Sequence, residues 1–477
     1  MSERKFAGPR WRLVTTLLAA AVLSGCDLIP EELAAAADDP ETLCKFALQP
    51  SFAYATYVKV NDQLAAGDDP EKIAHLDCFF DETDGRTAAE LFAEFKGDIF
   101  NDDVLYGFLE QNFNELFTTS RDAGRNRNGG VFAWGSRNLG KTAVVAYKRT
   151  GQKRFLQLYV DYFNNIMTLR DEVLGIHDDH HGRIMSSWGV DGTYFGRRRG
   201  QGKWVGHITF FAAIMQPATS FARIVRNDPK LKEFEPFAEE VVSLYRRAYP
   251  EFDMDFKAVP DTIFRWYWRP LIGKFEATNH VHLLGESLLD MYVLTGDELY
   301  ADRVRMFLRV FETSVMLDDD GLAAWTYFPY FQQERHIQKY IQERHSEVVW
   351  KGALTVPFVY QAVQDGFELN PATYAAITKT IREHIVANND YSNNIHPKGS
   401  GSILDFSKKP GVRKSGPATS IVGFLTAAAE DPAIAKQIRT TIATRPDLFP
   451  KGWFTRAERT LTDQMPIGYA YMLETAP

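Results

Sequence analysis

The sequence lacks the motifs that mark several large classes of protein. Its 477 residues contain no glycine-rich phosphate-binding loop and no dinucleotide-binding fingerprint. With only three cysteines, it also lacks the paired spacing of a zinc-binding cysteine cluster. Alternating strand patterns are scarce, whereas helical periodicity is frequent. We therefore predict an all-α protein that uses no cofactor.

Positive charge is also in short supply. The formal net charge is −8, which argues against nucleic acid as a partner. Charged residues make up 24% of the chain and hydrophobic residues 45%, a composition typical of globular proteins. The aromatic share of 13% is somewhat high for a globular protein. Several of the aromatic residues fall in loops beside histidine and arginine, which favours a ligand-binding cleft.

Residues 1–25 have the layout of a signal peptide. Basic residues, among them Lys5, Arg10 and Arg12, precede an apolar run, Leu13 to Leu23. This run is too short to span a bilayer as a mature helix. The run ends in Leu23-Ser24-Gly25-Cys26, which resembles the lipobox of bacterial lipoproteins. The alternative is a chance match in a cytosolic protein.

The lipobox resemblance implies that the chain is cleaved before Cys26 and that the sulfur of Cys26 carries a lipid. The folded body would then face the periplasm. Asp27 resembles the signal that retains enteric lipoproteins in the inner membrane, and the outer membrane is the alternative. Residues 26–43 are rich in Ala, Asp, Glu and Pro, so they are interpreted as a tether.

The other two cysteines, Cys44 and Cys78, suit an oxidising compartment, where they would form a disulfide. Closing a loop of about 34 residues contributes roughly 3–4 kcal/mol in the chain-entropy model. Two buried free thiols are the alternative.

Residues 44–477 repeat one helical pattern. Apolar helices are expected to start near residues 138, 207, 279, 345 and 415, about 65–75 residues apart. The turn Tyr147-x-x-Thr150-Gly151 recurs as Tyr292-x-x-Thr295-Gly296. A single helical hairpin buries only one face, so five or six such hairpins must stack together.

This layout resembles the (α/α) toroid enzymes that act on carbohydrates, which include polysaccharide lyases, unsaturated glucuronyl hydrolases and glucuronyl C5-epimerases. The resemblance implies that inner helices begin at a cleft. The polar residues near the expected helix starts, and hence the candidate catalytic residues, include His207, Asn279, His280 and His345.

Asn279-His280 resembles the Asn-His pair of alginate-lyase-like toroids, in which the pair neutralises a uronate carboxylate and takes part in abstraction of the C5 proton. A tyrosine moves the proton in those enzymes, and Tyr327 matches it best here. The pair is followed by Val281-His282-Leu283, without the expected Tyr-Trp. Such chemistry requires a stabilised enolate charge, which Asn, His, Arg and helix N–H groups supply without a metal.

Two loops carry residues that suit binding of an anionic polysaccharide or oligosaccharide. Arg197, Arg198 and Arg199 lie in a glycine-rich segment that also holds Trp188, and Trp325 opens an aromatic loop. The alternatives for the arginine run are a solvated surface or a contact with the membrane beside the lipid on Cys26.

The segment His177-Asp178-Asp179-His180-His181 contains residue types that bind several divalent metals. Adjacent residues cannot all point at one ion, and no partner spacing is evident. We therefore predict a metal-free polar turn that contributes one histidine to the cleft, and a metal site stays open as the alternative.

Two other function classes stay open. Glu276 and Glu347 flank two expected inner helices and are candidates for substrate contact, and a carboxylate pair is typical of a glycoside hydrolase. A polysaccharide-binding or scaffold lipoprotein without catalysis is the third hypothesis. The leading hypothesis is modification of a uronate-containing polysaccharide by β-elimination or C5 epimerisation.

The lipobox interpretation predicts that Cys26→Ser abolishes lipidation, because the sulfur that accepts the lipid is gone. Metabolic labelling with a fatty acid measures this directly. Cys44→Ser is the control and should be labelled like the wild type. Label retained by Cys26→Ser would contradict the interpretation.

Overall fold

A computed structural model describes residues 102–317, 320–329, 331, 347, 349–386 and 418–444. The signal peptide, the tether, the lipidation site Cys26 and the cysteines Cys44 and Cys78 lie outside the described residues, as does His345.

Helical hairpins build the described part of the chain. Each pairs one inner with one outer helix: α8 (Gly129–Thr150) with α9 (Arg154–Met167), α12 (Ile208–Asn227) with α13 (Glu235–Ala248), α14 (Thr278–Thr295) with α15 (Glu298–Ser314), α17 (Val349–Gln364) with α18 (Pro371–Thr380), and the 3₁₀ helix η10 (Ala418–Ala429) with α19 (Pro432–Thr444). Helix α7 (Asp102–Asp122) packs against both α8 and α9.

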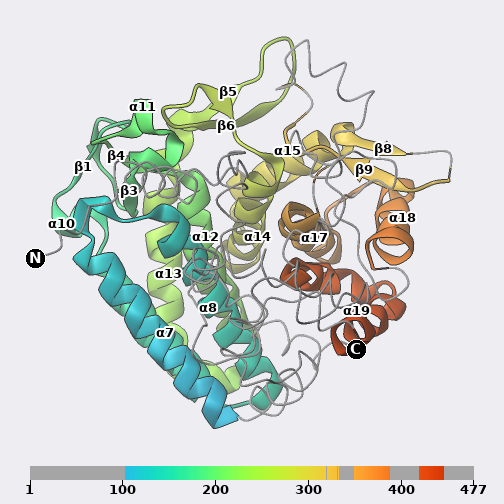
Figure 1. The fold of residues 1–477 in the computed structure, drawn as a ribbon, viewed down its shortest axis with the longest axis horizontal. Coiled ribbons are helices and arrows are strands. Elements are labelled where there is room, and N and C mark those ends of the chain that lie inside the picture. Colours follow the sequence, from blue (N-terminus) through green and yellow to red (C-terminus); the bar gives the residue numbers. More distant parts are fainter. Residues whose placement is uncertain are drawn as a thin grey trace, which may run out of the picture.

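The inner helices pack side by side in chain order, α8 on α12, α12 on α14, α14 on α17 and α17 on η10. Figure 1 shows them as an arc with α13, α15 and α18 outside it. This arrangement confirms the predicted all-α class and its (α/α) toroid layout. The described residues contribute five hairpins to it.

Close packing joins α14 to α17. A Cβ added at Gly285 of α14 would lie 2.4 Å from the ring of Phe358 on α17. Phe358 is fully buried, and the core extends along the whole row of inner helices. Glycine at this position therefore lets the aromatic ring approach the helix backbone.

The two repeated turns fold alike. Gly151 and Gly296 end α8 and α14 with φ values of 68° and 67°, a left-handed conformation that favours glycine. Each glycine N–H donates to the carbonyl of the tyrosine four residues earlier, Tyr147 or Tyr292. The repeated sequence pattern thus predicted a real structural repeat.

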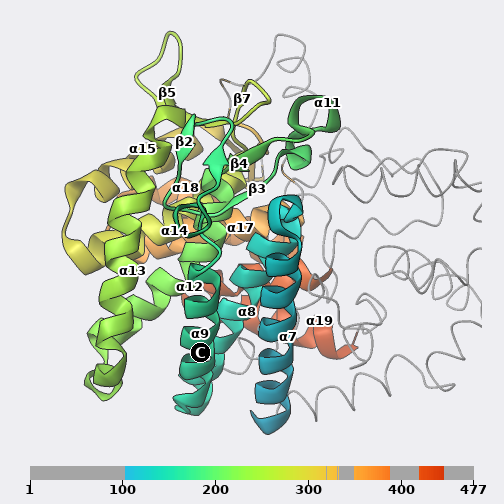
Figure 2. The same ribbon diagram turned by 90° about the vertical axis from the view of Figure 1, so that its left-hand side faces the viewer.

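Short antiparallel strands occupy the connections from α9 to α12, from α13 to α14 and from α15 to α17. Strand β1 (His177–Asp178) pairs with β2 (Arg183–Ile184), β3 (Gly189–Asp191) with β4 (Trp204–Gly206), β5 (Phe256–Ala258) with β6 (Arg265–Arg269), β6 with β7 (Lys274–Phe275), and β8 (Val315–Leu317) with β9 (Ala323–Trp325). Figures 1 and 2 show them gathered at one end of the helices, which forms a rim.

The remaining short helices are η2 (Gly124–Asn126), α10 (Asp171–Leu174), η3 (Gly192–Phe195), α11 (Arg197–Gly200), η4 (Pro229–Phe234), η5 (Tyr249–Asp255) and the π-helical turn η7 (Ile381–Ile385).

The expected helix start near residue 138 is wrong. Helix α8 begins at Gly129, because the side chain of Asn128 caps it by accepting from Gly130 N and Val131 N. Asn138 consequently lies inside the helix. The starts near 207 and 279 are confirmed by α12 and α14, whereas 345 and 415 lie outside the described residues.

Among the described residues, α12 alone is long and apolar enough to cross a membrane. It is a core helix, since 83% of its most apolar stretch is buried inside the protein.

Candidate functional site

The side chain of Glu276 joins two histidines at the rim. Its Oε2 lies 2.6 Å from Nε2 of His207, and its Oε1 lies 3.0 Å from Nδ1 of His280. Glu276 and His207 are fully buried, whereas 10% of the His280 side chain is exposed. We call these three residues the Glu276 cluster.

The local fold explains how the cluster forms. His207 occupies the N-cap position of α12, and His280 lies in the first turn of α14, four residues after Glu276. Glu276 itself follows β7, where its N–H donates to Tyr267 O and its carbonyl accepts from Trp266 Nε1. Two neighbouring inner helices and the β6–β7 hairpin therefore meet at one carboxylate.

Glu276 remains ionised because its partners outweigh its burial. Burial alone raises the pKa of a carboxyl group, but the guanidinium of Arg269 and the contacts with His280 and His207 hold the pKa of Glu276 well below its usual value. Arg269 Nε lies 3.5 Å from Oε1. Burial lowers the pKa of His207, with Glu276 opposing it, so His207 serves as a neutral donor to the carboxylate.

Tyr327 lies on the same rim. The backbone carbonyl of Tyr327 accepts from Thr278 N, so the aromatic loop contacts the start of α14. Burial, and then the negative charge of Glu276, raise the pKa of the Tyr327 hydroxyl above its usual range. Lys351 Nζ lies 3.7 Å from the centroid of the Tyr327 ring. The phenol is therefore a protonated group at neutral pH.

Asn279 and Trp134 complete the surroundings of His280. Asn279 is buried, and its Oδ1 has no hydrogen-bond partner among the described residues. The Trp134 ring centroid lies 5.9 Å from that of His280. A buried carbonyl oxygen without a partner carries a desolvation cost, which a hydrogen bond from a bound molecule would offset.

Glu347 is a second buried carboxyl group, and its charge when ionised, like that of Glu276, acts on the Tyr327 hydroxyl. It is fully buried, and Oε2 accepts from Trp325 Nε1 at 2.5 Å and from Thr355 Oγ1 at 3.1 Å. Burial raises its pKa to about 8, against the opposing effect of these two hydrogen bonds. Glu347 is therefore protonated at neutral pH, and the buried Trp325 supports it rather than offering an open stacking face.

The segment that carries Arg197, Arg198 and Arg199, which we call the arginine loop, lies near the Glu276 cluster. The ring of Phe195 packs edge-on against His207, with centroids 4.9 Å apart, and the chain continues directly into the loop. Arg198 and Arg199 line a surface depression together with Phe195, Gly196 and Ile272, and Arg199 Nη1 donates to Ile272 O. The side chain of Arg197 lies outside the described residues.

Trp188 makes none of the contacts described for the Glu276 cluster. It is buried, its Nε1 donates to Ile166 O at 2.7 Å, and its ring packs against Phe163.

Sequence reasoning missed Arg269, Trp134 and Lys351. Arg269 ends β6, within an aromatic strand whose pairing with β7 brings it to Glu276. Trp134 lies in the first turns of α8, whose start the sequence misplaced. No spacing along the chain indicates any of these contacts.

No family model matches this chain, and no curated protein matches it either. Solved structures show a distant likeness. The α-1,6-mannanase of Salegentibacter sp. HEL1_6 has a TM-score of 0.41 and 9% identity, covering 78% of this chain and 100% of that one. A sugar epimerase from a ruminal bacterium scores 0.39 with 13% identity, covering 65% and 74%. A polysaccharide lyase scores 0.42 with 11% identity, covering 82% and 98%. This likeness selects no reaction.

His282 differs from its neighbours at the start of α14. It is fully buried between the rings of Phe311 and Phe358, and neither ring nitrogen has a hydrogen-bond partner among the described residues. Burial lowers its pKa to about 3. His282 is therefore a neutral core residue.

We predict that His282 makes the fold less stable in acid. Between about pH 6.5 and pH 3 the unfolded chain binds a proton at this ring that the folded chain does not, so the free energy of unfolding falls by up to about 1.4 kcal/mol per pH unit. His282→Leu should flatten this dependence in denaturant titrations at pH 7.5 and pH 5. The exposed His177 supplies the control His177→Gln, which should keep the wild-type dependence. An unchanged dependence in His282→Leu would contradict the assignment.

Proposed function

We propose that this protein is an enzyme that acts on an anionic, uronate-containing polysaccharide. It removes the proton beside the sugar carboxylate, and the reaction continues as β-elimination or as C5 epimerisation. The observation that carries the proposal is the contact between Glu276 Oε1 and His280 Nδ1. In that contact Nδ1 of His280 bonds to the carboxylate, so Nε2 can face the substrate.

The contact fixes the tautomer of His280. A carboxylate accepts a hydrogen bond, so Nδ1 carries the proton and the lone pair of the neutral ring lies on Nε2. The partly exposed His280 then has the arrangement of a general base. Glu276 and His207 are positioning residues, since both are fully buried behind the ring.

Arg269 and Asn279 supply what the developing enolate needs. Arg269 lies beside Glu276 with 18% of its side chain exposed, and Asn279 precedes His280 in the chain. A guanidinium, an amide and the positive end of the α14 helix dipole stabilise negative charge as it forms on the uronate. This set would lower the barrier to proton removal without a metal.

Tyr327 supplies the second proton-transfer group. Its hydroxyl is protonated at neutral pH, because burial raises its pKa. If it protonates the leaving glycosidic oxygen, the product is an unsaturated sugar. If it returns a proton to the opposite face of C5, the product is the epimer. Both outcomes begin with the same proton abstraction by His280.

The arginine loop supports an anionic polymer as the substrate. Arg198 and Arg199 are exposed and stand next to Phe195, which contacts the Glu276 cluster through His207. In a chain of net charge −8, this basic group near the cluster favours binding of negatively charged sugars.

A glycoside hydrolase is the second candidate. Glu347 is protonated at neutral pH and Glu276 is ionised, which is the division of roles that an acid and a base require. Both carboxyl groups are fully buried, however, whereas about a tenth of the His280 side chain is exposed and Tyr327 is partly exposed. This difference favours the proton-abstraction mechanism. A binding or scaffold protein without catalysis is the third candidate.

We also propose that the enzyme is a lipoprotein of the bacterial cell envelope. The lipobox-like residues around Cys26 support an anchor at this position, with the helical body facing the periplasm. A polymer of the envelope or of the surroundings would then reach the rim.

The central prediction is that His280→Ala and Tyr327→Phe each lower kcat by roughly 10²–10⁴-fold, because each removes a positioned proton-transfer group. The substrates are uronate polymers. Elimination is measured by the ultraviolet absorbance of the new double bond. Epimerisation is measured by the incorporation of solvent deuterium at C5. Arg198→Gln with Arg199→Gln should instead raise KM and reduce its salt dependence.

His177→Gln is the matched control, since His177 is an exposed histidine of the same rim, and it should retain full activity. New reducing ends without absorbance or deuterium, lost in Glu347→Gln and retained in His280→Ala, would identify a hydrolase. Tight polymer binding with no product would identify a binding protein.

A further inference from the structure

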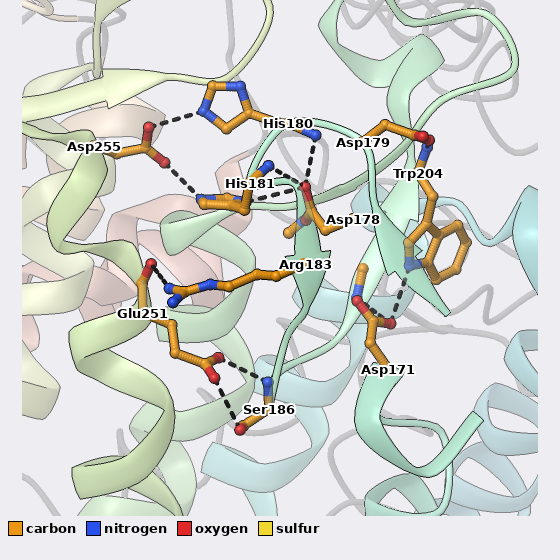
Figure 3. A network of polar contacts seen from close by, with 12 residues as sticks. Asp171, Asp178, Asp179, His180, His181, Arg183, Ser186, Trp204, Glu251 and Asp255 are labelled. Carbon is orange, nitrogen blue, oxygen red and sulfur yellow. Dashed lines mark hydrogen bonds and ion pairs between the residues drawn. The ribbon is translucent and has the colours of Figure 1, made fainter. Parts of the chain in front are cut away.

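A second cluster of histidines and carboxylates lies in the turn between β1 and β2. Figure 3 shows His180 and His181 pointing at one carboxylate, that of Asp255 at the end of η5. The turn itself confirms the predicted polar turn at residues 177–181. Its convergence on Asp255, 74 residues away from His181, is invisible in the sequence.

We propose that His180, His181 and Asp255 form a binding site for one divalent transition-metal ion, such as Zn²⁺. His180 Nε2 lies 2.9 Å from Asp255 Oδ1, and His181 Nε2 lies 3.0 Å from Oδ2. The three ligand atoms all lie within 4.8 Å of one another. Two imidazoles and a carboxylate are a ligand set that suits zinc and its neighbours.

The ligand atoms would have to adjust to accept an ion. Ligand atoms bound at 2.0–2.1 Å in a tetrahedral site are about 3.4 Å apart, so the two nitrogen–oxygen distances would lengthen by a few tenths of an ångström. The widest separation within the set, up to 4.8 Å, would shorten by up to about 1.4 Å. The two rings are perpendicular, at 87°, with centroids 4.7 Å apart. This orientation lets consecutive residues direct Nε2 at the same point.

Asp178 contacts the ring nitrogen of His181 that does not face Asp255. Its Oδ1 lies 3.1 Å from His181 Nδ1, and the same atom accepts from the backbone N–H groups of His180 and His181. Histidines that bind a metal commonly direct their other nitrogen at a carboxylate, which fixes the ring and increases its basicity. The carboxylate therefore orients His181 with Nε2 toward the ion.

Charge and burial also favour a cation here. Asp178 and Asp255 are fully buried, and their described ion pairs are with histidines, not with lysine or arginine. A buried carboxylate pair needs compensating positive charge. His180 keeps 18% of its side chain exposed, so the site is sheltered yet reachable from solvent.

The ion would join parts of the rim that support the Glu276 cluster. It would link the β1–β2 turn to η5, and Asp178 Oδ2 accepts from Gly206 N, the residue before His207. Arg183 and Ser186 already bind Glu251 of η5 in the same region, as Figure 3 shows. We therefore assign the ion a structural role.

The test uses the purified full-length protein after treatment with a chelator. Titration with Co²⁺, followed by its visible absorption, and with Zn²⁺, followed by calorimetry, should show one ion per chain. His180→Gln and Asp255→Asn should each weaken binding at least about 10-fold, and Asp178→Asn about 10–100-fold. His177→Gln removes a histidine of the same hairpin that is outside the cluster and should bind like the wild type.

Two results would overturn the site. One is the absence of stoichiometric binding by folded wild-type protein, which would leave a proton shared between the histidines and aspartates as the source of compensating charge. The other is binding that survives His180→Gln and Asp255→Asn but is lost in Glu276→Gln, which would place the ion at the other cluster. His180 is partly exposed, so its variant should fold, and circular dichroism checks this for each variant.

Discussion

The ionised carboxylate of Glu276 is the interaction on which the rim depends. A fully buried carboxylate is costly unless it is paired and hydrogen-bonded. Here the compensation comes from separate elements: His207 before α12, His280 in α14, Arg269 at the end of β6 and the N–H of Ala277. Each element must therefore reach its position for the charge to be tolerated, which couples the packing of the inner helices to the geometry of the candidate site.

Histidine serves different ends in this chain according to its surroundings. His282 lies among aromatic rings without a polar partner and stays neutral in the core. His280 is two residues away, but it reaches the rim and is oriented by a carboxylate. His180 and His181 converge on Asp255 in a polar turn. Burial and the nearest carboxylate, rather than residue type, decide which histidine takes part in chemistry.

The sequence predicted what is periodic or local. Helical spacing indicated hairpins, the repeated Tyr-x-x-Thr-Gly turn identified two equivalent helix ends, and histidines at helix starts indicated the rim. It could not indicate that Glu276 joins His207, 69 residues away, or that Arg269 reaches the same carboxylate. Those contacts depend on how neighbouring hairpins pack, which no pattern along the chain specifies. Trp188 and Trp325, chosen as sugar-binding residues because they lie in loops, are buried.

The proposed chemistry requires that Glu276 fixes His280 with its proton on Nδ1 and its lone pair on Nε2. Nitrogen-15 NMR of the histidine-labelled protein at pH 8 tests this most directly, with His280→Gln assigning the signal. We expect the Nδ1–H tautomer in the wild type and its loss, or a mixture of tautomers, in Glu276→Gln. A wild-type ring that carries its proton on Nε2, or a tautomer unchanged by Glu276→Gln, would contradict it.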